Sequence, residues 1–414
     1  MAGRGLAQAL HRIRWPLLSF AALHILVFLF VFPFWYEQPQ TSTDLYFHFA
    51  ANVFDGQVPY RDFAMEYPPL ALVFFLLPRL FASAPEAYAT VFQLQTLLWN
   101  LFGLLLVLLV STQLRISPLK SAIVYTVALL SIGPIIAIRY DIFPVVMVLA
   151  ALYAYLSHRP RFCWVLLALA TLTKVYPVVL LPVFLVWEYG HRNQGGMRSA
   201  LCTYTLIMLA VAVPLLVVTQ GQAFGALTYH AGRGLQIEST YASLLIVAHH
   251  LGLVSIASEF SFGSWNLTGS VADGLADLSV VCMVGVVVAL YWLMLRRSRA
   301  RSMSGGDSVA WSVALFAAII ATSKVFSPEY LIWLYPLTPL VSGKRRHLVW
   351  TLFIAIAMLT YYIYPLNYWD LVRLSPAVGT VLLVRNTMLI VFAFIVVRHR
   401  FGNTGSSPHL ENTQ

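Results

Sequence analysis

Long apolar runs separated by short polar segments dominate the chain. The first run, Trp15 to Tyr36, follows a basic start that contains Arg4, Arg12 and Arg14. Later apolar runs lie near residues 87–111, 119–138, 141–157, 161–173, 175–189, 199–219, 270–295, 308–323, 328–342, 346–364 and 378–397. Several reach the roughly 20 residues that a helix needs to cross a bilayer. The pattern therefore predicts an all-α polytopic membrane protein with about 12 transmembrane helices.

Composition agrees with this class. Of the 414 residues, 60% are hydrophobic and only 10% are charged, and the mean hydropathy is +0.77. A soluble domain carries about 25% charged residues. The net charge of +10 does not indicate nucleic-acid binding, because the basic residues form short clusters between apolar runs, as the positive-inside rule predicts. The three cysteines lie within apolar runs and are expected to be buried hydrophobes rather than metal ligands.

The topology has two solutions with twelve spans each, which differ at two places. Segment 68–84 either crosses the membrane or lies at its surface, and 161–189 is either one helix or two short ones. With 68–84 at the surface and two short helices, most of the 26 Lys and Arg residues are cytoplasmic. This choice also avoids a lysine, Lys174, in the middle of the membrane. Both termini are then cytoplasmic.

The chosen topology divides the chain into four parts. These are a catalytic membrane module, 1–219, with an external acid loop at 37–86; a second external loop, 220–269; C-terminal helices, 270–397; and a disordered cytoplasmic tail, 398–414. It also brings most ionisable groups that are not simple loop charges to the external membrane face: Asp44, Glu66, Arg139, Asp141, Lys174, Arg233, Glu238, Lys324 and Glu329. Such convergence predicts an active site at that face.

Asp44 follows the first helix in the polar run Thr41-Ser42-Thr43-Asp44. A carboxylate here can act as a general base that takes the proton of an attacking hydroxyl. The alternative is structural, because Thr43 or Asp44 before an apolar helical run has the chemistry of a helix N-cap.

Three further groups carry both a functional and a structural interpretation. Lys174 interrupts an apolar stretch, so it can bind a lipid phosphate or extend to the headgroups. Arg139 and Asp141 flank one tyrosine and can form a structural pair. Lys324 and Glu329 flank a Ser-Pro break and can bind phosphate, orient a sugar, or pair with each other.

The second loop contains Gly232-Arg233-Gly234, with His230 and Glu238 nearby. Glycines beside an arginine allow an anion-binding turn, although a solvated arginine has the same sequence. His230 is a possible base or donor, but a single loop histidine often has neither role. No DxD or CxxC motif and no Walker-type glycine loop occurs, so we expect no metal or other cofactor and no ATP-driven transport.

Five motifs along the chain resemble those of the C-type membrane glycosyltransferases, and more specifically of glycosyltransferase family 87. They are Asp44-Leu45-Tyr46, Gly56-Gln57-Val58-Pro59-Tyr60, Tyr67-Pro68-Pro69-Leu70, Lys174-Val175-Tyr176-Pro177 and Lys324-Val325-Phe326-Ser327-Pro328-Glu329-Tyr330-Leu331. Known members of the family include polyprenyl-phosphate-mannose-dependent α-mannosyltransferases. The likeness extends to about residue 340, and the last five runs are less diagnostic.

The resemblance implies an inverting, metal-independent transfer of a hexose, with mannose as the family expectation. The donor is a polyprenyl-phosphate sugar whose tail lies in a groove between helices, and the acceptor is a glycolipid or glycan at the external face of the plasma membrane. Asp44 is then the general base. Cations hold the leaving phosphate, Lys174 first and then Arg233, Lys324 and Arg139. Substrate contacts are expected from Tyr46, Glu66, Tyr67, Asp141, His230, Glu238 and Glu329.

Two other classes fit part of the pattern. A transporter or flippase of lipid-linked sugars also needs charges within the membrane, but usually has internal repeats and midplane sites. Here the charges gather at one face and no short-period repeat occurs. A glycan polymerase or ligase that uses a lipid diphosphate is the third class, and the acid loop directly after the first helix disfavours it.

Overall fold

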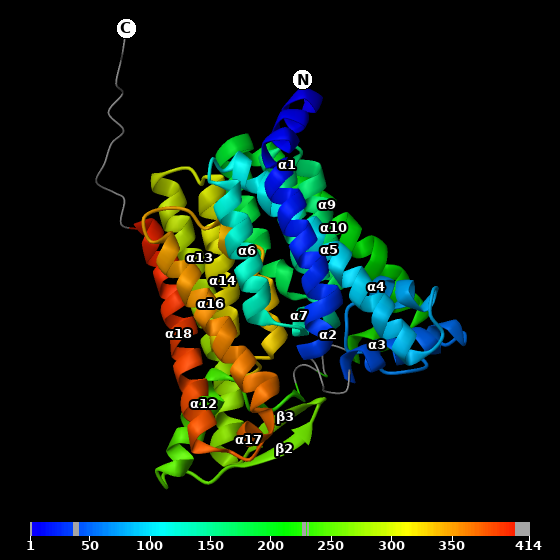
Figure 1. The fold of residues 1–414 in the computed structure, drawn as a ribbon, viewed down its shortest axis with the longest axis vertical. Coiled ribbons are helices and arrows are strands. Elements are labelled where there is room, and N and C mark those ends of the chain that lie inside the picture. The colour runs from blue at the N-terminus through cyan, green and yellow to red at the C-terminus, as the bar shows by residue number, and fades with distance from the viewer. Residues whose placement is uncertain (1, 36–40, 226–228, 230–231, 402–414) are drawn as a thin grey trace.

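A computed structural model describes residues 2–35, 41–225, 229 and 232–401, excluding the side chains of residues 2–7, 35, 41, 42, 191–194 and 399–401. The chain forms a bundle of roughly parallel and antiparallel helices (Figure 1). Its main helices are α1 (Ala2–Leu26), α5 (Pro85–Gln113), α6 (Pro118–Ile132), α8 (Ile142–Leu156), α9 (Pro160–Thr173), α10 (Leu181–Val218), α13 (Ser270–Ala300), α14 (Gly305–Thr322), α16 (Arg346–Tyr361) and α18 (Pro376–Phe401). The start of α1 and the end of α18 lie at the same end of the bundle.

The prediction of a polytopic membrane protein is confirmed. Within the described residues, seven helices are long and apolar enough to cross a bilayer: 8–34, 85–113, 195–218, 270–300, 305–322, 346–366 and 376–398. Four shorter apolar helices lie among them, at 118–132, 142–156, 160–173 and 176–190. A helix of 14 or 15 residues, such as α9 or α8, is only about 20 Å long. The shorter helices therefore end inside the thickness of the bundle.

Short elements connect these helices at the end of the bundle opposite the termini, here called the loop end. Helix α1 continues through η1 (Val27–Val31) and α2 (Phe32–Trp35), and α3 (Thr41–Phe54) and α4 (Ala71–Arg79) follow. With nine residues, α4 is too short to span a bilayer, so segment 68–84 does not cross it. The amide of Leu70 donates to Leu172 O at 3.0 Å, which fastens the start of α4 to the end of α9.

The predicted break at Lys174 is present. Lys174 follows the last residue of α9 in an extended conformation, and η2 (Tyr176–Leu180) then leads into α10. Trp187 packs on Tyr155 near the end of α8, with ring centroids 4.1 Å apart. Tyr204 instead donates to Thr171 near the end of α9. Because α8 and α9 are antiparallel, these contacts lie at opposite levels, so the chain reverses direction within α10.

The prediction of one helix at 328–342 is wrong. This segment consists of η4 (Pro328–Tyr330), α15 (Leu331–Leu334) and η5 (Thr338–Leu340). It still crosses the bundle, because Pro339 O accepts a hydrogen bond from Ser121 at the start of α6, far from Glu329 at the loop end. Prolines interrupt the helix, and burial of residues 331–341 among protein neighbours makes the irregular backbone tolerable at this depth.

The second loop contains a small antiparallel sheet that the all-α prediction omitted. The loop consists of η3 (Gln222–Phe224), β1 (Leu235–Gln236), α12 (Thr240–His250), β2 (Ala257–Ser261) and β3 (Ser264–Thr268), and the three strands form the sheet. The strand order is β1-β3-β2. Phe262 and Gly263, with φ of 50° and 68°, form the tight turn between β2 and β3. Leu235, Leu267 and Leu382 share a buried cluster, so the loop packs against the first half of α18.

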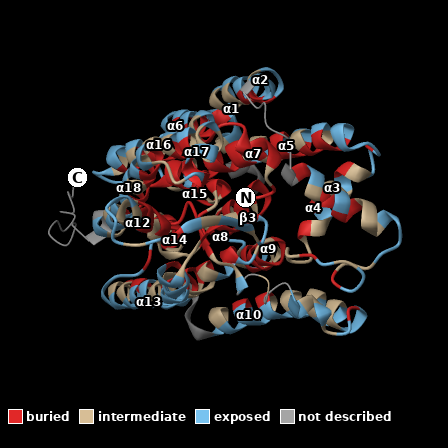
Figure 2. Cartoon of the chain, turned by 90° about the horizontal axis from the view of Figure 1, so that it is seen from below, coloured by how far each residue is buried: buried red, intermediate tan, exposed pale blue. Residues whose placement is uncertain are grey.

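Burial is greatest along the centre of the bundle, whereas the outer faces of α10 and α13 are exposed (Figure 2). At the loop end, η6 (Tyr362–Leu366) and α17 (Tyr368–Val372) connect α16 to α18, and α7 (Ile135–Ile138) lies between α6 and α8. Only 6% of the most apolar window in 195–218 is buried, which fits a helix that faces lipid.

A fully buried polar network joins α1, α5 and α6 inside the bundle. The ring of His24 lies 2.9 Å from Thr126 Oγ1 and 2.8 Å from Asn100 Nδ2. The hydroxyls of Tyr125 and Tyr335 both donate to Asn100 Oδ1 at 3.0 Å. Because this network satisfies its buried donors, it ties α1, α5 and α6 to the segment after α15.

Candidate functional site at the loop end

An ion pair lies where α9 ends and α8 begins. Lys174 Nζ is 2.6 Å from Asp141 Oδ1, and Asp141 is almost completely buried. The indole of Trp333 donates to the same carboxylate oxygen at 2.7 Å. Lys174 Nζ also lies over the rings of Tyr140 and Tyr330, at 4.7 and 5.6 Å from their centroids. The lysine is therefore held by one carboxylate and by aromatic faces.

A second pair lies beside the first. Arg139 Nη1 is 3.8 Å from Glu329 Oε1. Ser327 Oγ donates to the other oxygen of Glu329 at 2.6 Å. Arg139 Nε is buried and has no hydrogen-bond partner in the described part of the chain. The long separation and the unsatisfied donor leave this guanidinium able to form a further charge-assisted hydrogen bond.

Aromatic rings surround the two ion pairs. Tyr46 of α3 stacks on Phe75 of α4, with centroids 4.3 Å apart, and meets the edges of Tyr67 and Tyr140. The charges of Arg139 and Glu329 act on the Tyr46 and Tyr67 hydroxyls. These tyrosines therefore place polar tips beside the charges while their rings exclude water.

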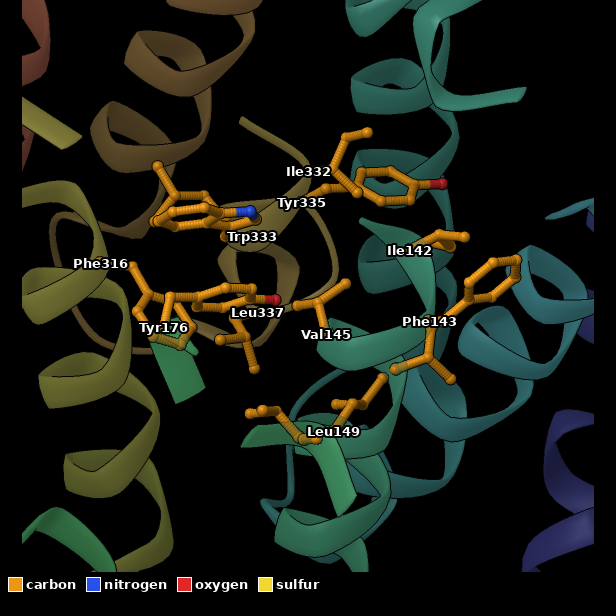
Figure 3. Close-up of a cluster of buried hydrophobic side chains, with 14 of the residues drawn as sticks. Ile142, Phe143, Val145, Leu149, Tyr176, Phe316, Ile332, Trp333, Tyr335 and Leu337 are labelled. Atoms are coloured by element: carbon orange, nitrogen blue, oxygen red, sulfur yellow. The ribbon is translucent and has the colours of Figure 1, made fainter. Parts of the chain in front are cut away.

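Below this layer the core is apolar. Tyr176 and Trp333 stack with centroids 3.9 Å apart and 3° between their planes, and Figure 3 shows them with Phe316 beside them. Ile142 and Val145 of α8 lie in the same cluster. The stacking fixes the indole of Trp333, and through it the carboxylate of Asp141.

Charged groups from the loops lie above the ion pairs. Arg233 Nη2 donates to Ser264 Oγ of β3 at 2.9 Å, and Arg233 Nε is buried without a partner in the described residues. Arg233 lies within electrostatic range of both Glu66 and Lys324. Burial raises the pKa of the Glu66 carboxyl above its ordinary value. Two cations and one acid thus lie together at the loop side of the site.

Glu238 lies within electrostatic range of the Arg139–Glu329 pair. Its side chain is 1% exposed, and its Oε1 atom has no hydrogen-bond partner among the described residues. Burial raises the pKa of Glu238 from 4.5 to about 8, although Arg385 opposes the shift. This carboxyl can therefore carry a proton near neutral pH.

Asp44 occupies a different environment. It lies in the first turn of α3 and is exposed. It is two residues from the buried Tyr46, and a two-residue step turns by about 200° around a helix, so the two side chains lie on different faces. The side chain of Asp44 forms no ion pair or hydrogen bond within the described residues. The alternative that Thr43 or Asp44 caps this helix is wrong, because α3 begins earlier, at Thr41.

The pairings differ from those expected from the sequence. Arg139 and Asp141 do not pair with each other but with Glu329 and Lys174. Glu329 pairs with Arg139 rather than with Lys324. Because the partners lie far apart in the chain, only the fold brings them together. The predicted site residues Tyr46, Glu66, Tyr67, Asp141, Glu238 and Glu329 do converge, whereas His230 lies outside the described residues.

Several residues of the site had no place in the sequence prediction. Tyr140, Tyr330 and Trp333 contact Lys174, but aromatic residues in apolar runs give no distinguishing signal. Arg385 had a signal, since it interrupts the apolar run at 378–397. Among the described residues, no group of three or more His, Cys, Asp or Glu side chains is placed to hold a metal ion.

The arrangement places two matched ion pairs beneath a loop side that holds two cations and the carboxyl of Glu66. Lys174 is matched by Asp141, and Arg139 by Glu329. Arg233 and Lys324 lie above them at the ends of the loops. Such an arrangement can bind an anion at the loop side and polar hydroxyl groups at the tyrosines.

A family model described as "Glycosyltransferase family 87" matches residues 65–328, more than half of the chain. The matched part contains all of the site except α3 and the residues after 328. No curated protein and no solved structure matched the chain.

Proposed function

Because this chain belongs to glycosyltransferase family 87 and is a membrane glycosyltransferase, we propose that it transfers a hexose from a polyprenyl-phosphate sugar to a lipid-linked or cell-envelope glycan acceptor. The hexose proposed is mannose. The loop end faces outward from the plasma membrane, and both termini are cytoplasmic. The observation that carries this proposal is the family match, together with the charged layer at the loop end, most of whose residues lie in the matched part of the chain.

The donor phosphate binds at the two cations of the loop side. Lys174 was the first choice from the sequence, but Asp141 already matches its charge at 2.6 Å. Arg233, whose Nε is buried without a partner in the described residues, therefore binds the phosphate first. Lys324 lies within electrostatic range of Arg233, and Arg139 adds its own Nε donor from below. Cations fixed before the reaction stabilise the phosphate charge that develops as the sugar leaves. Lys174 keeps a structural role, as the partner of the buried Asp141 carboxylate beneath the phosphate.

The lipid tail of the donor lies along the helices. An apolar cavity of about 390 Å³ lies between α6, α16 and η6, lined among others by Val127, Leu130 and Met358. Tyr364 of η6 lies within electrostatic range of Arg139, so the cavity is close to the charged layer. A chain in this cavity places its phosphate near Arg139.

Asp44 serves as the general base. The acceptor hydroxyl attacks the anomeric carbon from the face opposite the phosphate, and its proton passes to Asp44 while the sugar–phosphate bond breaks. The product has inverted configuration, and the polyprenyl phosphate leaves as an anion. Exposure of Asp44 supports this role, because an acceptor can reach its carboxylate. No metal ion or other cofactor takes part.

The test is transfer of mannose from synthetic polyprenyl-phosphate mannose to a membrane glycolipid extract. Wild type is compared with Asp44→Asn and with a matched control, Asp55→Asn, which changes an exposed acid just after α3. We expect transfer by wild type and the control, a loss of about 10²–10⁴-fold in Asp44→Asn, and no effect of EDTA. Equal transfer by all three removes Asp44 from the chemistry. Absence of transfer by all three overturns the donor or acceptor assignment and makes lipid flipping the next function to assay.

A further inference from the structure

Arg385 is a buried charge in the last helix, outside the residues that the family model matches. It lies ten residues into α18 and is 0% exposed. An arginine at this depth is costly unless polar partners compensate it. Its Nε and Nη1 atoms have no hydrogen-bond partner in the described residues. The residue therefore needs an explanation that packing alone does not supply.

The contacts that Arg385 does make all lead to the site. Its Nη2 donates to the main-chain oxygen of Glu238 at 2.9 Å. Its guanidinium lies over the ring of Phe326, 3.7 Å from the centroid. The neighbouring Asn386 donates to Ser239 O at 3.1 Å. Helix α18 thus contacts two segments, one at Glu238 and Ser239 and one at Phe326, which are about 90 residues apart in the chain.

Those two segments carry the charges of the loop side. The amide of Gln236 donates to Lys324 O at 3.0 Å, so the segments are also joined to each other. Phe326 lies two residues from Lys324 and three from Glu329. A change in the position of Phe326 therefore displaces both charged residues.

Glu238 completes the connection. Its carboxyl lies within electrostatic range of Arg385 of α18, Glu329 of η4, Arg139 before α8 and Tyr368 of α17. Arg385 can therefore influence the Arg139–Glu329 pair through Glu238, without a direct contact to either residue.

We propose that Arg385 is a positioning residue for the transfer reaction: its hydrogen bond to Glu238 O and its stacking on Phe326 hold Lys324 and Glu329 at their places in the site. The inference rests on the proposed function, but the position of the two segments can be measured independently. It makes α18 part of the catalytic unit, although the family model ends before it.

The experiment compares Arg385→Met, Arg385→Lys and the control Arg373→Met, purified as full chains in nanodiscs. Arg373 is an exposed arginine just before α18, in a weak pair with Asp370. Mannosyl transfer is measured with separate kcat and KM values for the donor, and amide hydrogen exchange is followed at residues 235–240 and 324–330. We expect Arg385→Met to lower kcat/KM by about a hundredfold and to speed exchange at both segments. Arg385→Lys shows a smaller effect of the same kind, and the control none.

Each outcome is decisive. A folded Arg385→Met with wild-type exchange at both segments overturns the positioning role, whatever the assay shows. Faster exchange with unchanged kinetics also overturns it, because the position would then not matter to the reaction. If Arg385→Met does not fold, Arg385→Lys decides, and wild-type behaviour of that variant refutes the proposal. If wild-type protein transfers no sugar, the proposed function fails, while the exchange data still test the contact.

Discussion

Lys174 Nζ lies 2.6 Å from Asp141 Oδ1, although 33 residues separate the two in the chain. Both residues lie at helix ends, Lys174 after α9 and Asp141 before α8. Trp333 donates to the same carboxylate oxygen, so three segments meet at one carboxylate. The pair lies next to the apolar core, because Trp333, which donates to Asp141, stacks on Tyr176 in that core (Figure 3).

Removal of one partner of this pair should destabilise the protein strongly. Lys174→Met leaves the carboxylate of Asp141 buried without its cation, and we expect it to lower the free energy of unfolding by about 3–5 kcal/mol. The double variant Lys174→Met/Asp141→Asn should cost less than the sum of the single variants, which unfolding by SDS in mixed micelles can measure. The exposed Arg61–Asp62 pair is the control, with little change expected. Additive effects at 174 and 141 would contradict the assigned pairing.

Arg233 should govern donor affinity. Its guanidinium is half-buried beside Lys324 and is held only by Ser264 in the described contacts. Loss of a charged hydrogen bond to the donor phosphate in Arg233→Gln should reduce kcat/KM by about tenfold or more, mainly through a higher donor KM. Arg61→Gln, on the exposed side of the first loop, is the control. An unchanged donor KM in Arg233→Gln would move the phosphate to another cation.

Glu238 should make stability depend on pH. Burial raises the pKa of Glu238 from 4.5 to about 8, so the folded state favours the protonated form. The resulting stabilisation is fully present below about pH 4.5 and is lost as the pH rises through about 8. The loss is at most about 1.4 kcal/mol per pH unit within this window. Thermal unfolding of wild type and Glu238→Gln between pH 5 and 9 measures it: the difference between the two proteins should change with pH, and parallel curves would refute the assignment.

Asn100 should be a stability residue without a catalytic role. Its Oδ1 accepts from Tyr125 and Tyr335, and its amide contacts His24. Asn100→Leu leaves two buried hydroxyls without this acceptor, and we expect a loss of roughly 2–5 kcal/mol in unfolding free energy. Leu98→Ala on the exposed face of the same helix is the control. Transfer per folded molecule should stay near wild type, so a specific loss of kcat would place the network within the catalytic machinery.

The sequence predicted that these ionisable residues converge at one end of the bundle, but not how their charges pair. An ionisable residue in an apolar run is costly, so Lys174 by itself indicates a helix break. Its partner could not be inferred, because Asp141 approaches only through the antiparallel packing of α8 and α9. The sequence offered Lys324 as one possible partner of Glu329, because the two lie close in the chain, whereas the fold brings Arg139 to Glu329.

Two parts of the fold were missed for identifiable reasons. The run at 328–342 is apolar because protein surrounds it, and hydropathy does not distinguish this from burial in lipid. Its three prolines were the available signal. The hairpin of β2 and β3 is only two five-residue strands, and the Phe262-Gly263 turn is a weaker signal than Asn-Gly. The role of Asp44 as general base stays a prediction from the family likeness, because its local sequence alone favoured a helix cap.

The ends of α8 and α9 add a mechanical consequence to their ion pair. The carboxyl end of a helix carries partial negative charge and the amino end partial positive charge, so Lys174 and Asp141 each also suit the end of the helix to which they belong. A slide of α9 by one turn, about 5.4 Å, would separate the pair and move both charges away from these favourable positions. The pair therefore fixes the axial register of α8 and α9, and any sliding of one helix along the other would first have to break it.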